Sequence, residues 1–328
     1  QYVFDLLIEE NICFGAMSFD TLTGERTAHL ADAVVLCTGG HTRIWKNSSS
    51  RKDENTGDGL HLGLKAGCEL SDMEMIQFHP TGMVLPKELS GTLVTEAVRG
   101  EGGILLNSLG ERFMAKYDSE RLELSTRDKV AMANYTEIIE GRGTKNGGLF
   151  LDISHKNKDF IIEKIPKIYR QFIENSLIDI SKSPMEVSPT AHYSMGGIKV
   201  NAKDHSTKIK GLFAAGEVSC GLHGANRLGG NSLAEILIFG AHAGLAASKF
   251  SKSISSQKRS QQAISKCHKN LNNTISTGDE NVHLIKEELR NIMWKYCGVV
   301  RNEEGLKKGI KQNNNIEKQL PFIDMRLE

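Results

Sequence analysis

Apolar stretches dominate the first 40 residues and predict β structure there. Ile12 to Ser18 and Arg26 to Leu30 flank Thr23-Gly24-Glu25, where a hairpin turn is expected because glycine permits a tight reversal. Ala33 to Cys37 (AVVLC) is fully apolar and runs into Thr38-Gly39-Gly40. A strand that ends in paired glycines is typical of a dinucleotide-binding fold, although this short motif alone is a weak signal.

The middle of the chain alternates between helical and extended patterns. A helix is expected from about Arg127 to about Glu140, with Thr126 as its N-cap, and Leu149 to Ile153 predicts a strand. The stretch from Asp159 to about Asn175 is amphipathic, but Pro166 should kink or split it because proline cannot continue the helical hydrogen bonds. We interpret its apolar residues as core.

The C-terminal part has a different composition. Residues 248–281 are rich in Ser, Lys, Gln and Asn and show no clear core face, whereas Leu284 to Tyr296 is amphipathic again. No apolar run approaches the length of a membrane span, and the N-terminus has no signal-peptide pattern. We therefore expect a soluble protein, which does not exclude docking onto a membrane partner.

The most informative stretch is Gly211 to Gly240 (GLFAAGEVSCGLHGANRLGGNSLAEILIFG), which reads as a strand, a glycine-rich loop and a helix. Ser232 and Glu235 should form a capping box at the helix start. Glu217 follows the apolar strand and suits a hydroxyl-rich ligand such as a ribose or ribitol, while the planar fork of Arg227 suits a carboxylate. An ordinary strand–loop–helix turn fits the same letters, but the glycines and the arginine together favour a ligand site.

Composition excludes some classes of function. The 328 residues are 39% hydrophobic and 25% charged, as in an ordinary globular protein. Lys+Arg 41 against Asp+Glu 40 leaves almost no net charge, so nothing indicates a nucleic-acid partner. The six cysteines show no CxxC and no metal-ligand spacing, so we interpret them as reduced thiols and expect no metal site.

The chain has no GxGxxG motif after an N-terminal strand, which is the usual signature of binding to the ADP part of FAD. The nearest candidate, Gly57-Asp58-Gly59 with Gly63, has the wrong last spacing and follows a polar loop. The chain also begins with Gln1 and opens in the middle of a pattern. We expect a fragment that lacks the first part of its nucleotide-binding domain.

Several long motifs carry a family resemblance from about Ala33 to about Gly244. GLHGANRLGGNSL, MIQFHPTG (residues 75–82) and TEAVRGEGG (residues 95–103) resemble segments of the flavoprotein subunits of succinate dehydrogenase and fumarate reductase. L-aspartate oxidase is the related alternative, although such oxidases usually carry a small residue and serine where Gly229-Gly230 stand. The resemblance implies FAD as cofactor.

The resemblance also implies an α/β fold with a partial Rossmann-like FAD-binding domain, an inserted α+β capping domain and a helical C-terminal region. The implied domains are 1–75 (FAD-binding, in part), 76–194 (capping), 195–247 (return to the FAD-binding domain) and 248–328 (helical). The resemblance implies that this last domain is incomplete, because more chain normally follows it in the family. Substrate then lies at the junction of the first two, where clefts commonly bind small molecules and domain closure excludes water.

By resemblance, the site residues fall into three groups. The proton-transfer residues are Arg127, which is the acid or base, and Glu96 and Arg99, which relay the proton. Substrate is bound by His79, Thr95, His192 and Arg227. The flavin is contacted by Thr38, Gly39, Gly40, Asp58, Glu217, Arg227, Ser232 and Leu233.

Each of these residues also has a simpler interpretation. A lone histidine such as His79 is more often structural, the i,i+3 pair Glu96–Arg99 is usually a solvated ion pair, and Arg127 alone would be a surface cation. Asp58 fits a helix N-cap as well as a flavin contact. The length of the matching motifs favours the functional interpretation.

The implied reaction is the interconversion of succinate and fumarate, with a role in electron transport and the tricarboxylic acid cycle. The implied partners are a dicarboxylate substrate and an iron–sulfur subunit, with no nucleic acid. Membrane association is expected only through partner subunits, from the cytoplasm and on the inner face of the membrane. Two alternatives stay open: L-aspartate oxidase, and a truncated chain that binds no flavin and is inactive alone.

Overall fold

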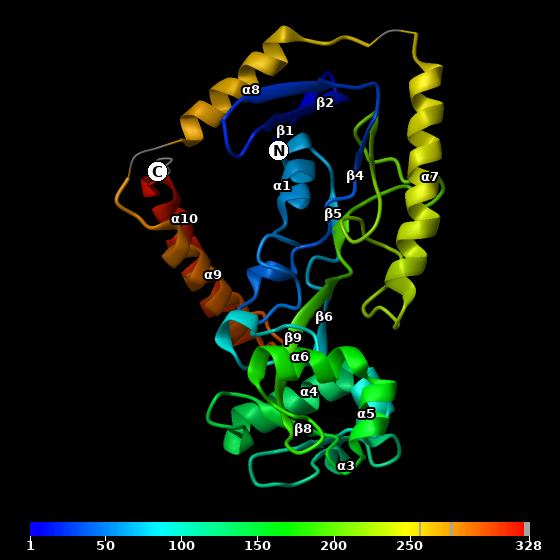
Figure 1. The fold of residues 1–328 in the computed structure, drawn as a ribbon. Helices are drawn as coiled ribbons and strands as arrows, with labels where there is room; N and C mark the ends of the chain where they lie inside the picture. The colour runs from blue at the N-terminus through cyan, green and yellow to red at the C-terminus, as the bar shows by residue number, and fades with distance from the viewer. Residues whose placement is uncertain (256, 276–277, 325–328) are drawn as a thin grey trace.

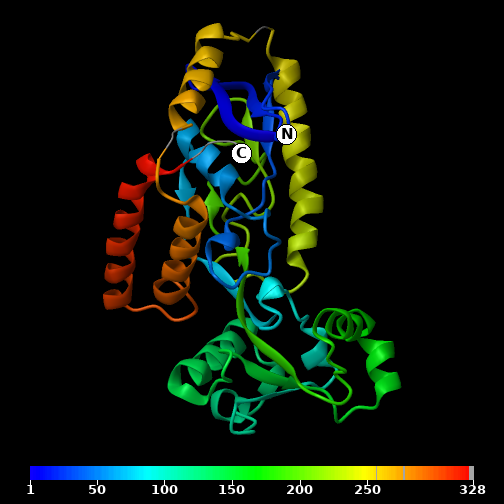
Figure 2. The ribbon, with the colours of Figure 1, turned by 60° about the vertical axis from the view of Figure 1, so that its left-hand side comes forward.

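The computed structural model describes residues 1–255, 257–275 and 278–324. Figure 1 shows an upper part that holds both the first strands and a long helix, and a lower part made of the central third of the chain. Two long strands connect the parts, and a pair of C-terminal helices lies beside the junction, as the turned view in Figure 2 also shows. The junction between the parts is where the predicted substrate residues converge.

The upper part is built from small sheets, two of which contain the first four strands. The antiparallel sheet has the order β1 (Tyr2–Glu9), β2 (Ile12–Phe19) and β3 (Arg26–Leu30), so the predicted hairpin is confirmed. The second sheet pairs β4 (Val34–Leu36) with β11 (Leu212–Ala214) in parallel. These strands are distant in sequence, and their parallel pairing brings both carboxyl ends to one edge, as in dinucleotide-binding folds.

Helix α1 (Asp58–Ala66) and the short strands β5 (Leu70–Ser71) and β10 (Gly197–Ile198) complete the upper part. Apolar side chains from these elements and from the sheets form one buried cluster. Its members include Leu6, Leu36, Leu60, Leu62, Ile198, Ile209, Leu212 and Val218. Burial of this surface is the main term that holds the returning strand β11 against β4.

The lower part contains a four-stranded sheet in the order β6 (Ile76–Met83), β9 (Met185–Ser194), β8 (Leu149–Asp152) and β7 (Ile104–Leu106). All three pairings are antiparallel. Strands β6 and β9 make the most extensive pairing and run up into the junction (Figure 1). The sheet therefore carries residues of the lower part directly to the upper part.

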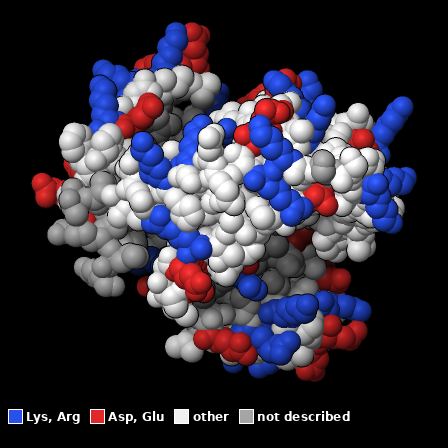
Figure 3. All heavy atoms as spheres, turned by 90° about the horizontal axis from the view of Figure 1, so that it is seen from above, with Lys and Arg blue, Asp and Glu red and all other residues white. Residues whose placement is uncertain are grey.

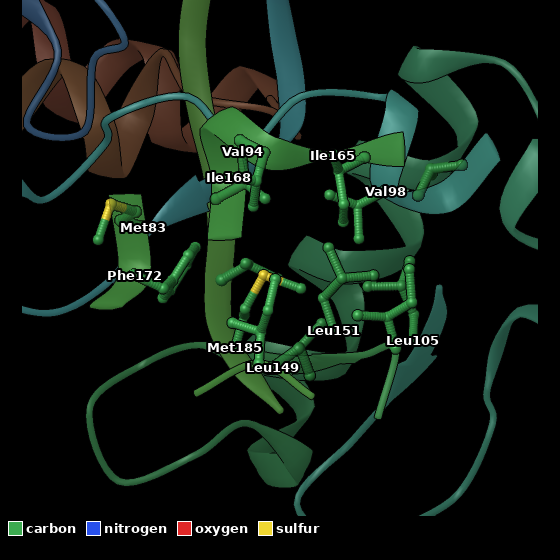
Figure 4. Close-up of a cluster of buried hydrophobic side chains, with 14 of the residues drawn as sticks. Met83, Val94, Val98, Leu105, Leu149, Leu151, Ile165, Ile168, Phe172 and Met185 are labelled. Atoms are coloured by element: carbon green, nitrogen blue, oxygen red, sulfur yellow. The ribbon is translucent and has the colours of Figure 1, made fainter. Parts of the chain in front are cut away.

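Helices cover this sheet around a second apolar core, part of which is drawn in Figure 4. Fully buried Leu105, Leu149 and Leu151 of the strands belong to one cluster with Ile168 and Phe172 of a helix. The helices are α2 (Ala97–Gly100), α3 (Met114–Tyr117), α4 (Arg127–Glu137), the π-helical turn Ile138–Arg142, α5 (Lys158–Lys164) and α6 (Pro166–Ser176). Pro166 splits α5 from α6, so the predicted interruption is confirmed.

Helix α7 (Asn231–Ser253) corrects two expectations. Its N-cap is Gly230 in the left-handed conformation, and no side chain caps it, so the predicted Ser232–Glu235 capping box is wrong. The αL backbone of Gly230 turns the chain into the helix, and Glu235 is engaged elsewhere. Within the described residues, α7 is also the one helix long and apolar enough to cross a membrane by length and composition, against our expectation of no such run.

The C-terminal region is helical, with α8 (Gln261–Thr274), α9 (Val282–Tyr296) and α10 (Glu303–Gln319). Helix α8 falls in the stretch for which no core face was expected. Its Ala263, Ile264 and Cys267 pack against Leu7, Phe14 and Met17 of the antiparallel sheet. Short 3-10 turns occur at Thr42–Ile44, Lys87–Leu89, Leu122–Leu124 and Leu320–Phe322.

The surface is mixed in charge. On the face drawn in Figure 3, basic and acidic side chains are interspersed, in keeping with the near-zero net charge. A local concentration of cations is found instead at the junction, where several arginines are buried or half-buried.

Candidate active site

Two predicted substrate residues, His79 on β6 and His192 on β9, lie on neighbouring strands with their ring centroids 5.4 Å apart. His79 is only 1% exposed, and its Nδ1 accepts the backbone N–H of Thr81 at 3.2 Å. His192 Nδ1 lies 2.8 Å from the hydroxyl oxygen of Ser49. Each ring is thus anchored through Nδ1, which leaves Nε2 as the nitrogen available to a ligand.

Both histidines are neutral near pH 7. Burial lowers the pKa of His79 well below its ordinary value, and the nearby His192, Arg99 and Arg127 lower it further. Burial, with Arg227 and Arg127 beside it, lowers the pKa of His192 to about 4. Neutral imidazoles can donate hydrogen bonds to a carboxylate without adding charge to a site already rich in arginine.

Arg127, Glu96 and Arg99 form a connected chain. Arg127 begins α4, and its Nε and Nη2 donate to Glu96 Oε2 at 2.8 and 2.7 Å. The other oxygen of Glu96 lies 3.8 Å from Nη2 of Arg99, which is 2% exposed and whose Nη1 donates to the backbone oxygen of Glu123. The structure brings these three predicted residues together, with Thr95 one position before Glu96. A solvated i,i+3 pair does not describe them, because Arg99 is buried.

Arg227 lies in the glycine-rich loop and is 5% exposed. Its guanidinium stacks on the ring of Tyr193 at 4.3 Å, its Nη2 donates to Gln77 Oε1 at 3.0 Å and its Nη1 to the backbone oxygen of Leu228 at 3.3 Å. Its Nε has no hydrogen-bond partner among the residues that the structure describes. A buried, partly unpaired guanidinium is suited to receive a carboxylate.

Gln77 is a site residue that the sequence analysis missed. It lies two residues before His79 on β6, and its Oε1 accepts hydrogen bonds from both Arg227 (3.0 Å) and Arg127 (3.4 Å). The spacing of two in a strand places Gln77 and His79 on the same side of the sheet, which was the available signal. Gln77 joins the two predicted arginines into one site.

The sequence analysis also missed a group of three residues, Tyr193, Glu235 and His223, of which Tyr193 contacts Arg227. The Tyr193 hydroxyl donates to Glu235 of α7, and His223 Nε2 lies 3.0 Å from the same carboxylate oxygen. Burial and the Glu235 carboxylate raise the pKa of Tyr193. The tyrosine therefore stays protonated and presents a fixed ring to Arg227.

Three of the eight predicted flavin residues, Gly39, Glu217 and Ser232, line a cavity of about 360 Å³ at the carboxyl ends of β4 and β11. Its lining includes Cys37, Gly39, Tyr193, Ala215, Gly216, Glu217, Ser232, Ile236 and Gly240. Ligands of open α/β sheets bind at such strand ends. The position of the cavity therefore fits a dinucleotide cofactor.

Glu217 is the main polar group of this cavity. One of its oxygens accepts the backbone N–H of Ser194 at 2.9 Å, and Asn55 Nδ2 donates to the carboxylate at 3.2 Å. Burial raises its pKa to about 7 despite these hydrogen bonds. Gly40 must lack a side chain, because a Cβ there would lie 2.6 Å from Glu217 Oε1 and 2.5 Å from Ser194 Oγ. A buried carboxylate with spare acceptor capacity suits the hydroxyl groups of a flavin nucleotide.

The other predicted flavin residues are distributed unevenly. Thr38 is exposed and lies between the lining residues Cys37 and Gly39, while Leu233 of α7 is 66% exposed. Asp58 is not brought to this cavity. It follows the N-cap Gly57 at the start of α1 and lines a separate cavity of about 540 Å³ with Tyr2, His61 and Lys65. Gly57 rather than Asp58 is therefore the N-cap, and the flavin contact of Asp58 stays a prediction.

No cluster of three or more His, Cys, Asp or Glu side chains suited to a metal occurs among the described residues. The charged and titratable groups that meet at the junction are instead Arg127, Arg227, the two histidines and Glu96. Tyr193 lines the cavity and also supports Arg227, so it connects the cavity to this junction.

Comparisons with known proteins show which families the chain matches. Residues 1–233 match the family model described as FAD binding domain, and residues 286–327 match the one described as fumarate reductase flavoprotein C-term. The chain is 48% identical to an uncharacterized FAD-dependent oxidoreductase of Methanocaldococcus jannaschii, over 97% of this chain and 57% of that protein.

It is 45% identical to one of the subunits of the fumarate reductase (CoM/CoB) of Methanothermobacter marburgensis, over 98% of this chain and 58% of the relative. Its structure is similar to the FrdA chain of Escherichia coli quinol fumarate reductase, with a TM-score of 0.91 and 34% identity over 98% of this chain and 57% of that one. The chain thus spans a little over half the length of the relatives it matches.

Proposed function

Because the chain belongs to the family of FAD-binding flavoproteins that includes fumarate reductases and succinate dehydrogenases, we propose that it forms part of an enzyme that interconverts succinate and fumarate. FAD is the cofactor of this family. The observation that carries the proposal is the meeting of Arg127 and Arg227 on one amide oxygen beside two neutral histidines.

This arrangement favours a small dianion. Arg227 and Arg127 supply two positive charges, and His79 and His192 supply neutral donors for the remaining carboxylate lone pairs. Because Arg227 and the histidines lie on different elements, they can hold one carboxylate turned out of the plane of the substrate double bond. Such a twist removes conjugation and makes the neighbouring carbons easier to attack.

The reaction needs a hydride at one carbon and a proton at its neighbour. Side chains do not carry hydrides, so FAD supplies that part of the chemistry when bound. The cavity at the carboxyl ends of β4 and β11 would hold it, with Glu217 and the glycines Gly39 and Gly216 in contact.

Arg127 would supply or take up the proton. An isolated guanidinium is a poor acid because its pKa is far above neutrality. The two hydrogen bonds to Glu96 hold Arg127 in one orientation, and Glu96 continues toward Arg99, so a lost proton can be replaced. Glu96 is half-exposed, with 48% of its side chain accessible, which gives the relay a route to water.

We propose the same domain boundaries as the sequence indicates: 1–75 and 195–247 for the FAD-binding domain, 76–194 for the capping domain and 248–328 for the helical region. Separate apolar cores support this division, since one runs from Leu6 to Val218 and the other lies wholly between Met83 and Val187. Relatives are subunits of larger reductases, which supports partner subunits for this protein. We propose that one of these partners is an iron–sulfur protein, and that membrane association occurs through partners from the cytoplasm.

A dye-linked assay on the full-length natural protein with bound FAD tests the proposal. We expect succinate to reduce an artificial electron acceptor and fumarate to oxidise a reduced viologen. L-aspartate is the control substrate, because a related oxidase reaction would use it in place of succinate. Turnover with L-aspartate and none with either four-carbon dicarboxylate would contradict the proposal.

A further inference from the structure

The side-chain amide of Gln77 is fully used. Gln77 is 3% exposed, and its Nε2 donates to Asn226 Oδ1 and to the backbone oxygen of Arg227, both at 2.6 Å. Its Oε1 accepts from Arg227 at 3.0 Å and from Arg127 at 3.4 Å. An amide has two donor hydrogens and two acceptor lone pairs, so all four positions are filled from within the protein.

The acceptor side of this amide lies between two like charges. Arg127 and Arg227 repel each other, and burial makes that repulsion stronger than it would be in water. The oxygen of Gln77 carries a partial negative charge that both guanidiniums share, without the full charge of a carboxylate. It therefore holds the two cations at a fixed separation and adds no negative charge beyond the Glu96 carboxylate that already pairs with Arg127.

The donor side ties the loop to the sheet. Through Nε2, Gln77 fixes both the backbone of Arg227 and the side chain of Asn226. Asn226 in turn donates to Asp128 Oδ1 at 3.1 Å, and Asp128 follows Arg127 at the start of α4. The strand β6, the glycine-rich loop and α4 are thus joined at one side chain.

We propose that Gln77 is a positioning residue that sets the separation and orientation of Arg127 and Arg227, and thereby the affinity of the site for a four-carbon dicarboxylate. The proposal rests on the proposed function, since it assigns both arginines to one substrate. Gln77 itself contributes through the arginines, because its hydrogen-bonding capacity is already used.

Two substitutions separate this role from a structural one. Gln77→Met has a similar volume but makes none of the four hydrogen bonds, so the arginines should move apart. Gln77→Glu keeps an acceptor for both arginines, but it loses the two donor hydrogens of Nε2, and its charge competes with the substrate. Gln171→Met is the matched control, because the Gln171 amide donates to the backbone oxygen of Leu93 and contacts neither arginine.

The measurement is malonate binding by isothermal titration calorimetry, together with KM and kcat for succinate, on the full-length protein with bound FAD. Malonate has two carboxylates but no adjacent carbon pair to desaturate, so it reports binding alone. Gln77→Met and Gln77→Glu should each weaken malonate binding by about 10- to 100-fold, the effect of losing one charged hydrogen bond. Gln171→Met should bind as the wild type does, and the KM of the Gln77 variants should rise more than kcat falls.

The outcomes separate the two proposals. If the wild type binds neither malonate nor succinate, the proposed function is wrong and this inference falls with it. If the wild type binds both and a folded Gln77→Glu variant keeps wild-type affinity, only the role of Gln77 is overturned. If affinity falls in proportion to the loss of thermal stability in Gln77→Met while Gln77→Glu is unaffected, Gln77 is structural only.

Discussion

Glu217 gives the cavity a pH dependence that can be measured without turnover. Its carboxylate is enclosed by the ends of β4 and β11, accepts the Ser194 N–H and the Asn55 amide, and still has a pKa raised by burial from the ordinary 4.5 to about 7. Desolvation is thus the larger effect, and the folded protein without ligand binds a proton at Glu217 more tightly than the unfolded chain does.

This difference in proton affinity sets the direction in which the unfolding free energy changes with pH. The stabilising effect of the protonated group is fully present below about pH 4.5 and is lost as the pH rises through about 7. A rise in pKa of this size corresponds to about 3 kcal/mol of unfolding free energy, at 1.36 kcal/mol for each tenfold change in proton affinity. Glu217→Gln is neutral at every pH and should not lose this contribution.

The assay is urea unfolding of the flavin-free, full-length protein between pH 5 and pH 8. The unfolding free energy of the wild type should fall by about 2–3 kcal/mol relative to Glu217→Gln across this range. Glu88→Gln, at an exposed glutamate in a surface turn, is the control and should run parallel to the wild type. Bound FAD should reduce the difference, because hydroxyl donors stabilise the ionised carboxylate. Parallel curves for wild type and Glu217→Gln would refute the argument.

Three further predictions test two residues at the junction and one ion pair in the lower part. Arg127→Lys cannot make both hydrogen bonds to Glu96, so turnover should fall about 10²- to 10⁴-fold in the dye-linked assay while malonate affinity changes less. Gly229→Val should lower turnover without lowering the urea midpoint, because even a Cβ at Gly229 would lie 3.2 Å from Arg127 Nη2. An unchanged turnover would contradict the close approach of Gly229 to Arg127. Glu137→Gln should lower the unfolding free energy by about 1.5–3 kcal/mol, since it removes the charge of a buried carboxylate that pairs with the partly exposed Arg142, and an unchanged free energy would argue against that pair.

Local patterns in the sequence were enough to predict much of the fold. The hairpin around Gly24, the strand before Thr38 and the break at Pro166 depend on glycine, proline and continuous apolar runs, which act over a few residues. The helix α8 could not be recognised, because its apolar face is narrow and becomes a core face only against Phe14 and its neighbours in the first sheet.

The candidate site, like the fold, could be predicted only in part. The motifs led to His79, His192, Arg127 and Arg227, and the structure brings these four residues together. Their functional roles stay predictions.

Contacts between distant segments could not be read from the sequence. Gln77 is hydrogen-bonded to Arg227, which lies 150 positions later in the chain. Tyr193 of β9 is hydrogen-bonded to Glu235 of α7, which is 42 positions later. The expected capping box failed for the same reason, because Glu235 is drawn into a long-range contact with Tyr193 and His223 that local spacing does not encode.

The most direct test of the central claim is an anaerobic visible spectrum of the full-length protein with bound FAD, titrated separately with succinate and L-aspartate. We predict that succinate bleaches the flavin absorption, that L-aspartate leaves it unchanged, and that Arg127→Ala abolishes the bleaching by succinate. Bleaching by L-aspartate alone, or by neither compound although flavin is bound, would contradict the assignment of this site to succinate and fumarate.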